Sequence, residues 1–132
     1  MLVARVRRSI LSRGLIPRRS LVLCACSGGP DSAALLAVLS RLQAELGFSL
    51  QAASVDHGLR PEAAADVARA AEQADRVGVP FHALRIQVSP GASLQARARE
   101  GRYGVLRELA QRLGAGRVAI GHTQDDQAET VL

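Results

Sequence analysis

Short apolar runs alternate with longer amphipathic stretches along most of this chain. The apolar runs cover residues 21–26, 50–55, 81–86 and 117–120, and such continuous hydrophobicity is typical of strands buried on both faces of a sheet. Between them, apolar residues recur at helical spacing over 32–46, 61–77 and 94–113. Each helical stretch is followed by a glycine, which can end a helix in the left-handed conformation: Gly47, Gly78 and Gly114.

This alternation predicts the fold class. Repeated strand, helix, strand units joined by right-handed crossovers form a parallel sheet with helices on both faces. We therefore expect an α/β domain with a doubly wound parallel sheet of at least four strands. In such sheets the ligand lies beyond the carboxyl ends of the strands, at the point where the strand order reverses.

Helical spacing also appears near both ends of the chain. A first helix that ends near Gly14 is predicted by apolar residues at Val3, Val6, Ile10 and Leu11. A last helix that begins close to Asp125 is predicted by the apolar positions Ala128, Val131 and Leu132.

The composition is that of one globular domain. The chain has 132 residues, of which 48% are hydrophobic, and a mean hydropathy of +0.08, values that favour a buried core over disorder. No apolar stretch approaches the ~20 residues of a membrane span. Cys24 and Cys26 share one face of the first predicted strand, so we interpret them as core residues rather than metal ligands. A cytoplasmic protein without a membrane partner is expected.

Positive charge is concentrated at the start of the chain. The net charge is +5, and all 17 basic residues are arginines. Six of them precede the first acidic residue, Asp31, whereas the segment from Ser20 onward has a net charge of −1. An acid-free, arginine-rich start is compatible with a transit peptide, but the helical spacing favours a first helix with a basic outer face. That face would serve solvation or attract the phosphates of RNA.

The segment between the first predicted strand and the next helix has the composition of a phosphate site. It consists of Ser27, Gly28, Gly29, Pro30, Asp31 and Ser32. The glycines allow close approach of the backbone to a polyphosphate, and the helix that follows directs N–H groups at an anion. Asp31 could hold a magnesium ion. The alternative interpretation of this segment is an ordinary turn. The segment is not a Walker A loop, because that loop needs a lysine and the chain contains none.

This segment resembles the PP-loop, S-G-G-x-D-S, of the ATP pyrophosphatases. Three further segments resemble motifs of the tRNA(Ile)-lysidine synthases. Residues 55–60 match V-D-H-G-L-R, residues 98–103 match A-R-x-x-R-Y, and residues 122–130 match H-x-x-D-D-Q-x-E-T. The four matches follow the order of the family and span most of the chain.

The resemblance implies a Rossmann-like fold of the adenine nucleotide alpha hydrolase type and a ligase that forms a carbon–nitrogen bond. ATP would adenylate the C2 oxygen of the anticodon wobble cytidine, and the ε-amine of lysine would then displace AMP. The implied partners are ATP, Mg²⁺, L-lysine and a tRNA(Ile) with a CAU anticodon, and a homodimer is possible. Residues 1–132 would form the N-terminal catalytic domain, which we expect to be truncated at its C-terminal end and to lack the tRNA-binding domains.

The same resemblance implies roles for individual residues. The residues expected to bind ATP are Ser27, Gly28, Gly29, Pro30, Asp31, Ser32, Val55, Asp56, His57, His122 and Thr123. Those expected to take part in catalysis are Asp31, which would also hold the metal, Arg99, Arg102, Asp126 and Glu129. If Asp126 and Glu129 lie three apart on a helix, both carboxylates can face one lysine.

Each assignment has a simpler structural alternative. Asp56 and His57 could be turn residues, Asp125 and its neighbours a helix cap, and the two arginines a solvated helix face. Arg60 suits a phosphate or RNA. Gly101 and Gly104 weaken their helix by about 1 kcal/mol each, a cost that close approach of a backbone or ligand would explain.

Two other functions remain open. One is another PP-loop enzyme that modifies tRNA, such as a 2-thiocytidine synthetase, although those proteins use cysteine pairs in loops to hold an iron–sulfur cluster and no such pair occurs here. The other is a nucleotide-binding module without catalytic activity. Lysine-dependent formation of AMP would separate the three.

Overall fold

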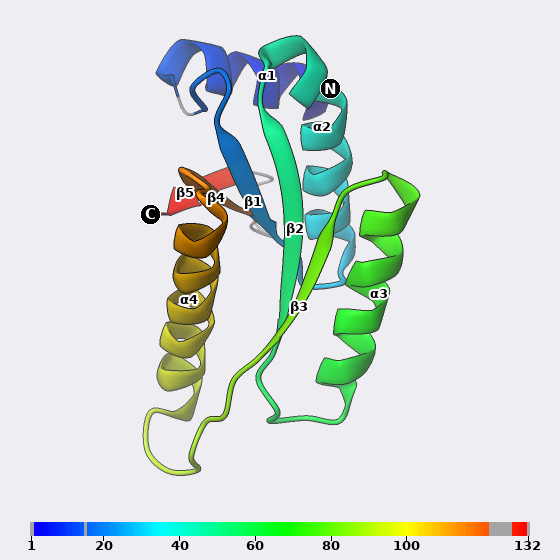
Figure 1. The fold of residues 1–132 in the computed structure, drawn as a ribbon. Helices are drawn as coiled ribbons and strands as arrows, with labels where there is room; N and C mark the ends of the chain where they lie inside the picture. Colours follow the sequence, from blue (N-terminus) through cyan, green and yellow to red (C-terminus); the bar gives the residue numbers. More distant parts are fainter. Residues whose placement is uncertain (1, 15, 122–127, 132) are drawn as a thin grey trace.

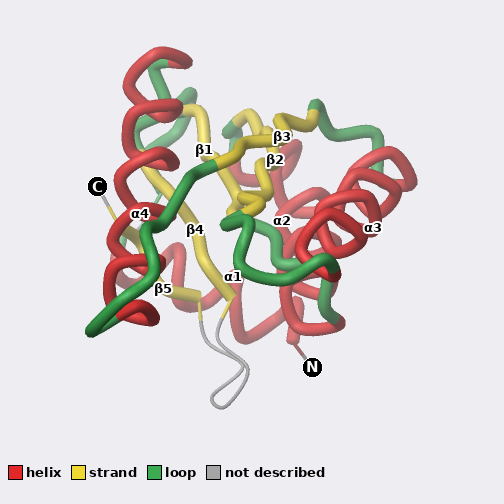
Figure 2. The backbone as a smooth tube through the Cα atoms, turned by 90° about the horizontal axis from the view of Figure 1, so that it is seen from below, coloured by secondary structure: helices red, strands yellow, loops and turns green. Residues whose placement is uncertain are grey.

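The computed structural model describes residues 2–14, 16–121 and 128–131, and they form a sheet covered by helices on both faces (Figures 1 and 2). In chain order the elements are α1 (Leu2–Arg13), β1 (Leu21–Ala25), α2 (Pro30–Leu46), β2 (Ser49–Asp56), α3 (Glu62–Arg76), β3 (Phe81–Arg85), α4 (Leu94–Leu113), β4 (Arg117–Gly121) and β5 (Ala128–Val131). The strand order is β3-β2-β1-β4-β5. The first four strands are parallel, as predicted.

Strand β1 lies at the centre of the sheet and contributes to both cores. Val22 and Cys24 point to the face covered by α1, α2 and α3, whereas Leu23 and Ala25 point to the face covered by α4. All four are buried, which explains why the strand is a continuous apolar run. Edge strand β3 is more exposed, because its other side pairs with no described strand.

The predicted helices are confirmed with bounds shifted by two residues or fewer, and α4 matches 94–113 without a shift. Gly47 ends α2 in the left-handed conformation (φ 73°), and its N–H donates to the Gln43 carbonyl at 2.9 Å. None of the described helices combines the length and the apolar character needed to cross a bilayer.

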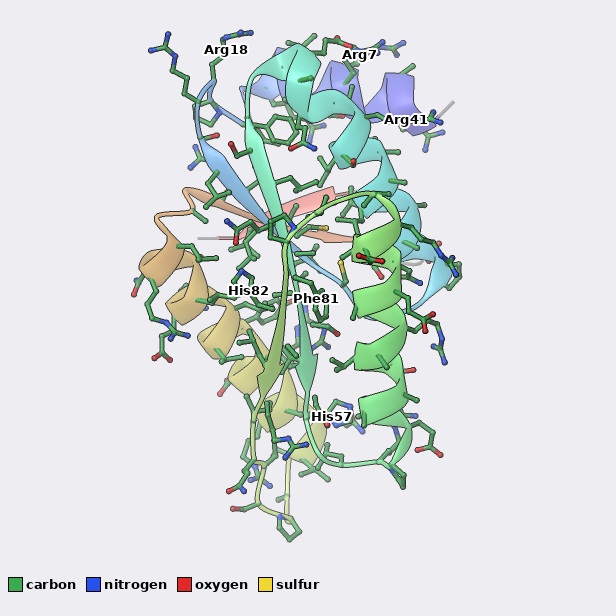
Figure 3. All side chains as sticks on the ribbon, turned by 45° about the vertical axis from the view of Figure 1, so that its right-hand side comes forward. Arg7, Arg18, Arg41, His57, Phe81 and His82 are labelled. Carbon is green, nitrogen blue, oxygen red and sulfur yellow. The ribbon has the colours of Figure 1, made fainter. Side chains whose placement is uncertain are left out.

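The predicted first helix is also confirmed as α1. Its apolar side, Val6 and Ile10, is buried in the core that contains α2. Arg7 of α1 lies 2.9 Å (Nε) and 3.0 Å (Nη2) from the carboxylate of Glu45 on α2. The arginine-rich start therefore packs as part of the domain, at the end of the sheet where the parallel strands begin (Figures 1 and 3).

The predicted last helix is wrong. Ala128–Val131 forms strand β5, antiparallel to β4, with Glu129 opposite Ile120 and Val131 opposite Val118. Three apolar positions do not distinguish a helix from a short strand, and the β-branched residues Thr130 and Val131 favour a strand where a sheet edge is available. Glu129 therefore does not lie on a helix, and the expected placement of Asp126 and Glu129 on one helix face is lost.

The order of the strands creates a reversal point beside β1. The chain passes from β1 to β2 and β3 on one side of the sheet and then returns to β4 on the other side of β1. The carboxyl ends of β1 and β4 lie side by side there, at the kind of place where open α/β sheets bind their ligands.

Candidate functional site

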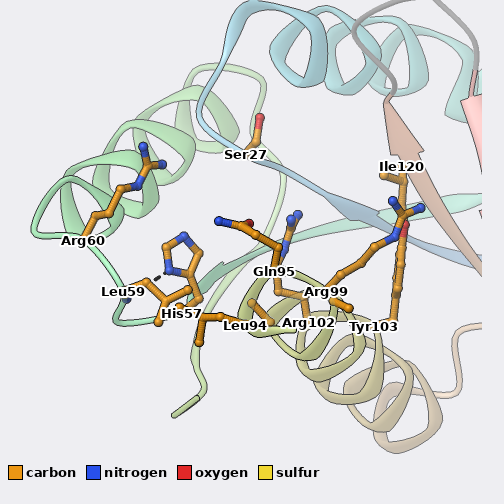
Figure 4. Close-up of a pocket in the computed structure, with 12 residues that line it drawn as sticks. Ser27, His57, Leu59, Arg60, Leu94, Gln95, Arg99, Arg102, Tyr103 and Ile120 are labelled. Atoms are coloured by element: carbon orange, nitrogen blue, oxygen red, sulfur yellow. Dashed lines mark hydrogen bonds between the residues drawn. The ribbon is translucent and has the colours of Figure 1, made fainter. Parts of the chain in front are cut away.

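A cavity of about 920 Å³ opens at this reversal point. Its lining comes from the loop after β1 (Ser27), the end of β4 (Ile120), the loop after β2 (His57, Leu59 and Arg60) and the N-terminal half of α4 (Leu94, Gln95, Ala96, Ala98, Arg99, Arg102 and Tyr103) (Figure 4). This volume is at the upper end of the ~300–1,000 Å³ typical of small-molecule pockets. The structure thus unites Ser27, His57, Arg60, Arg99 and Arg102, which the sequence analysis selected from separate motifs.

The loop of residues 27–32, called here the 27–32 loop, is held together by its two serine hydroxyls. Ser32 Oγ accepts the N–H of Ser27 at 3.0 Å and lies 3.2 Å from Ser27 Oγ. Ser27 Oγ in turn accepts the N–H of Gly29 at 3.3 Å. Ser32 is 4% exposed, whereas Ser27 is exposed at the cavity. The buried hydroxyl therefore organises the loop and leaves the exposed hydroxyl beside the cavity.

Helix α2 begins in this loop without a side-chain cap. Gly29 is the N-cap in an extended conformation, and Pro30 occupies the first turn. An uncapped N-terminus leaves N–H groups that can bind an anion, and an N-terminus carries a partial positive charge. Asp31 lies half-buried in the same turn. A cation held by its carboxylate would therefore also contact a phosphate that is bound by the loop.

Gly28 is required for a reason that the sequence analysis did not find. Its φ is +84°, and a Cβ at this position would collide with the backbone carbonyl oxygen of Asp66 on α3 and lie 3.1 Å from the carbonyl carbon. The carbonyl of Gly28 also accepts a hydrogen bond from Gln73 Nε2 at 3.1 Å. The close neighbour of this glycine is thus helix α3, whereas the sequence analysis explained it by a polyphosphate.

The loop after β2 is stabilised by its own side chains. Asp56 Oδ1 accepts the N–H of Gly58 at 2.8 Å, and Oδ2 lies 3.8 Å from Arg85 Nη2. His57 Nδ1 accepts the N–H of Leu59 at 3.1 Å, so a neutral ring carries its proton on Nε2. Val55 packs against the core under α4. Of the predicted residues Val55, Asp56 and His57, the last lines the cavity, while Asp56 adopts the turn geometry of its simpler alternative.

Helix α4 contributes Arg99 and Arg102 to the positive charge of the cavity, beside Arg60 from the loop after β2. The Arg99 guanidinium carbon lies 5.3 Å from the centre of the Tyr103 ring, within the range of a cation–π interaction. The side chains of Arg99 and Arg102 extend from the helix toward the strand ends (Figure 4). A Cβ on Gly101 would lie 3.0 Å from Ile86 Cδ1, whereas one on Gly104 would meet nothing within 4 Å. Of these two glycines, only Gly101 has a close neighbour. That neighbour is the side chain of Ile86, and not the backbone or ligand that was expected.

Several predicted site residues cannot be placed in this cavity. His122, Thr123, Asp125 and Asp126 lie outside the described residues. Glu129 is on β5, opposite the cavity residue Ile120. Strand β4 itself reaches the cavity, because its next-to-last residue, Ile120, lines it.

Both cysteines are buried in the core beneath α2, as predicted, and neither lines the cavity. The side-chain interaction with Cys26, together with burial, raises the pKa of Cys24, and the interaction with Cys24 lowers the pKa of Cys26, whose thiol donates to the Cys24 carbonyl oxygen at 3.6 Å. Among the residues that the structure describes, no group of three or more His, Cys, Asp or Glu side chains could hold a metal by itself.

Sequence reasoning missed some residues of the site. Leu59, Leu94 and Gln95 line the cavity, and Gln73 supports the 27–32 loop from α3. The position of Leu59 within the 55–60 motif was a usable signal. Gln73 carried none, because it lies 45 residues from Gly28 in an ordinary helical pattern.

The chain belongs to a known class of nucleotide-binding domain. The model of the family described as the PP-loop domain matches residues 4–132, and the chain is a member of that family. The chain is also similar to tRNA(Ile)-lysidine synthases. It is 40% identical to the one from Dehalococcoides mccartyi over 100% of this chain and 29% of the relative, and 44% identical to the one from Salinispora arenicola over 98% and 40%. The chain thus spans well under half the length of these relatives.

Two solved structures share the fold. The U34-tRNA thiolase NcsA from Methanococcus maripaludis, with its [4Fe-4S] cluster, superposes with a TM-score of 0.78 at 19% identity, over 94% of this chain and 45% of that one. The glutamine-dependent NAD⁺ synthetase from Acinetobacter baumannii, in complex with ADP, superposes with a TM-score of 0.62 at 26% identity, over 89% and 23%.

Proposed function

We propose that this chain is the ATP-binding part of a tRNA(Ile)-lysidine synthase, an enzyme that joins L-lysine to the wobble cytidine of a tRNA(Ile) with a CAU anticodon. The observation that carries the proposal is the cavity that Ser27 of the 27–32 loop lines together with Arg99 and Arg102 of α4. These residues come from two different motifs of the resemblance, and they form one site. The similarity to relatives of that name supports the choice of reaction.

The first step would form an adenylate. The C2 oxygen of cytidine attacks the α-phosphorus of ATP, and the bond from that phosphorus to the bridging oxygen of pyrophosphate breaks. The Ser27 hydroxyl, positioned by the buried hydroxyl of Ser32, and the N–H groups at the start of α2 would hold the phosphates. Arg99 and Arg102 would face the negative charge that develops on pyrophosphate. A half-buried carboxylate beside a phosphate site suits Mg²⁺, so Asp31 would hold that ion, which supplies further charge neutralisation.

The second step would form the carbon–nitrogen bond. The neutral ε-amine of lysine attacks C2, the bond from C2 to the adenylate oxygen breaks, and AMP leaves. The amine must lose a proton, and we assign its acceptor to Asp126 or Glu129 of the 122–130 motif. The location of Glu129 on β5, opposite Ile120, is compatible with a lysine site at the end of β4.

The cysteines argue against the alternative of a tRNA thiolase. A [4Fe-4S] cluster is held by cysteine thiolates, and this chain has two cysteines, both buried away from the cavity. A thiolase would have to obtain its ligands elsewhere.

The decisive experiment supplies the protein with ATP, Mg²⁺, tRNA(Ile) and labelled lysine. We expect tRNA-dependent release of pyrophosphate and transfer of label to the tRNA from a protein of the full length of the relatives, of which this chain covers 29% and 40%. Binding of ATP without any pyrophosphate release would support the non-catalytic module, and incorporation of sulfur in place of lysine would support the thiolase.

A further inference from the structure

Helix α3 contacts the 27–32 loop at two points on one helix face. The backbone carbonyl of Asp66 lies against the Cα of Gly28, where a side chain would collide with it. Two turns further along, Gln73 Nε2 donates to the carbonyl oxygen of the same glycine at 3.1 Å. Helix α3 contributes nothing to the lining of the cavity, so this support acts from behind the loop.

A continuous chain of polar contacts leads from Gln73 to the cavity. Gln73 holds the carbonyl of the peptide group that joins Gly28 to Gly29. The N–H of that same peptide group donates to Ser27 Oγ at 3.3 Å. Because a peptide group is planar, a partner that fixes its carbonyl also fixes the direction of its N–H. A single rigid peptide group thus separates Gln73 from the side chain of Ser27, a residue that lines the cavity.

The other end of the Gln73 amide suggests a role beyond packing. Gln73 Oε1 is buried and has no hydrogen-bond partner among the described residues. A buried acceptor without a partner destabilises the folded state, and a side chain of similar shape without polar atoms would avoid that cost. A buried polar atom without a partner calls for an explanation, and a functional role of the residue is one.

From these contacts we infer that Gln73 is a positioning residue of the nucleotide site. It fixes the Gly28–Gly29 peptide group and, through it, orients the Ser27 hydroxyl toward the phosphates. The inference rests on the proposed function in so far as the ligand is ATP. It assigns a role to a residue outside all four sequence motifs and outside the cavity.

The test is a double-mutant cycle on Gln73 and Ser27. Gln73→Met keeps the length and the apolar stem of the side chain but removes the donor, and Ser27→Ala removes the hydroxyl. We expect each single variant to weaken binding of a non-hydrolysable ATP analogue about tenfold, the effect of one lost hydrogen bond. Because Gln73 acts through Ser27, adding Gln73→Met to Ser27→Ala should weaken binding less than twofold further. Gln111→Met, on an exposed position of α4, is the matched control and should bind like the unaltered chain.

Two further measurements separate positioning from stability. Gln73→Met removes one hydrogen bond and one unpartnered acceptor together, so its melting temperature should stay within about 5 °C of the original. In the ligand-free protein, hydrogen exchange of the Gly29 amide should be about tenfold faster in Gln73→Met, because that amide loses its fixed orientation.

The outcomes are distinguishable. Additive effects of the two substitutions on nucleotide binding would overturn the route through Ser27, and affinity loss that merely follows a large fall in melting temperature would make Gln73 a packing residue. Unchanged exchange of the Gly29 amide would overturn the positioning role in any case. If the unaltered chain binds no ATP analogue, the proposed function fails, and the exchange measurement still decides whether Gln73 orients the loop.

Discussion

Substituting Gly28 and Gly29 by alanine should affect different properties of the protein, although the two glycines are adjacent in one motif. Gly28→Ala should lower its stability, whereas Gly29→Ala should mainly weaken nucleotide binding. Gly28 has a φ of +84° and its Cα faces the Asp66 carbonyl of α3, whereas Gly29 has a φ of −85°. A Cβ on Gly29 would have Ser27 Oγ as its nearest neighbour, at 3.4 Å. Gly28→Ala therefore disturbs the packing of α3, and Gly29→Ala disturbs the side of the loop that carries the Ser27 hydroxyl.

The magnitude for Gly28→Ala follows from three contributions to the free energy of unfolding. The left-handed conformation costs a residue with a Cβ about 1 kcal/mol. Moving α3 away from the new methyl group costs about 1–3 kcal/mol, as in an overpacked core. Loss of the Gln73 hydrogen bond adds about 1 kcal/mol. The total of about 3–5 kcal/mol should lower the melting temperature by roughly 10 °C or more in a domain of this size.

Gly29→Ala should lower stability by no more than about 1 kcal/mol, because its backbone conformation is open to any residue and the loss is that of a better N-cap. Its effect should appear in nucleotide binding. The assay is thermal unfolding followed by circular dichroism, together with titration of an ATP analogue on the folded protein. Equal and small changes of melting temperature in the two variants would refute the contact between Gly28 and α3.

Three further predictions concern the proposed reaction. Asp31→Ala should abolish tRNA-dependent pyrophosphate release while leaving the melting temperature within about 5 °C of the original, because this half-buried residue contributes no core packing; near-normal adenylation by the folded variant would exclude a role in holding Mg²⁺. Glu129→Gln should weaken the use of lysine about tenfold or more while changing ATP binding little, since a charged hydrogen bond contributes about 1.5–3 kcal/mol; equal losses for lysine and ATP would make Glu129 a structural residue of β5. Arg5 and Arg8 are exposed on α1, and replacing both by glutamine should make the plot of log binding constant for tRNA against log salt concentration less steep. The slope should change by up to about two, one for each lost phosphate contact. The same slope as in an Arg112→Gln control would assign these arginines to solvation.

The elements of the fold were predictable where a local pattern agreed with its surroundings. Strand β1 is apolar throughout because it is buried on both faces, and α2 ends at Gly47 because that residue takes a left-handed conformation. Both causes lie within a few residues of the element itself. The same holds for the 27–32 loop, whose place between a strand and a helix can be read directly from the sequence.

Features that depend on distant contacts were not predictable in this way. β5 forms because β4 offers a free edge, and that edge outweighs a short apolar pattern with helical spacing. The contacts of Gly28 with Asp66 and Gln73 depend on how closely the crossover helix α3 docks against the loop. The motif alone indicates that Gly28 must be a glycine, but the neighbour that requires it is α3, which no local pattern reveals.

The central position of β1 also has a consequence for the order of events during synthesis. Val22 of β1 pairs with Leu50 of β2 on one side and with Arg117 of β4 on the other. Strand β1 therefore gains its second neighbour only after most of the described chain has been made. At translation rates of about 5–20 residues per second, the interval between β1 and β4 lasts several seconds or longer. Throughout it, one edge of an apolar strand lacks its native partner and is open to misassociation. Ser27 and Ile120 meet in the cavity only when that edge is closed, so competence to bind a nucleotide would report that the sheet has been completed.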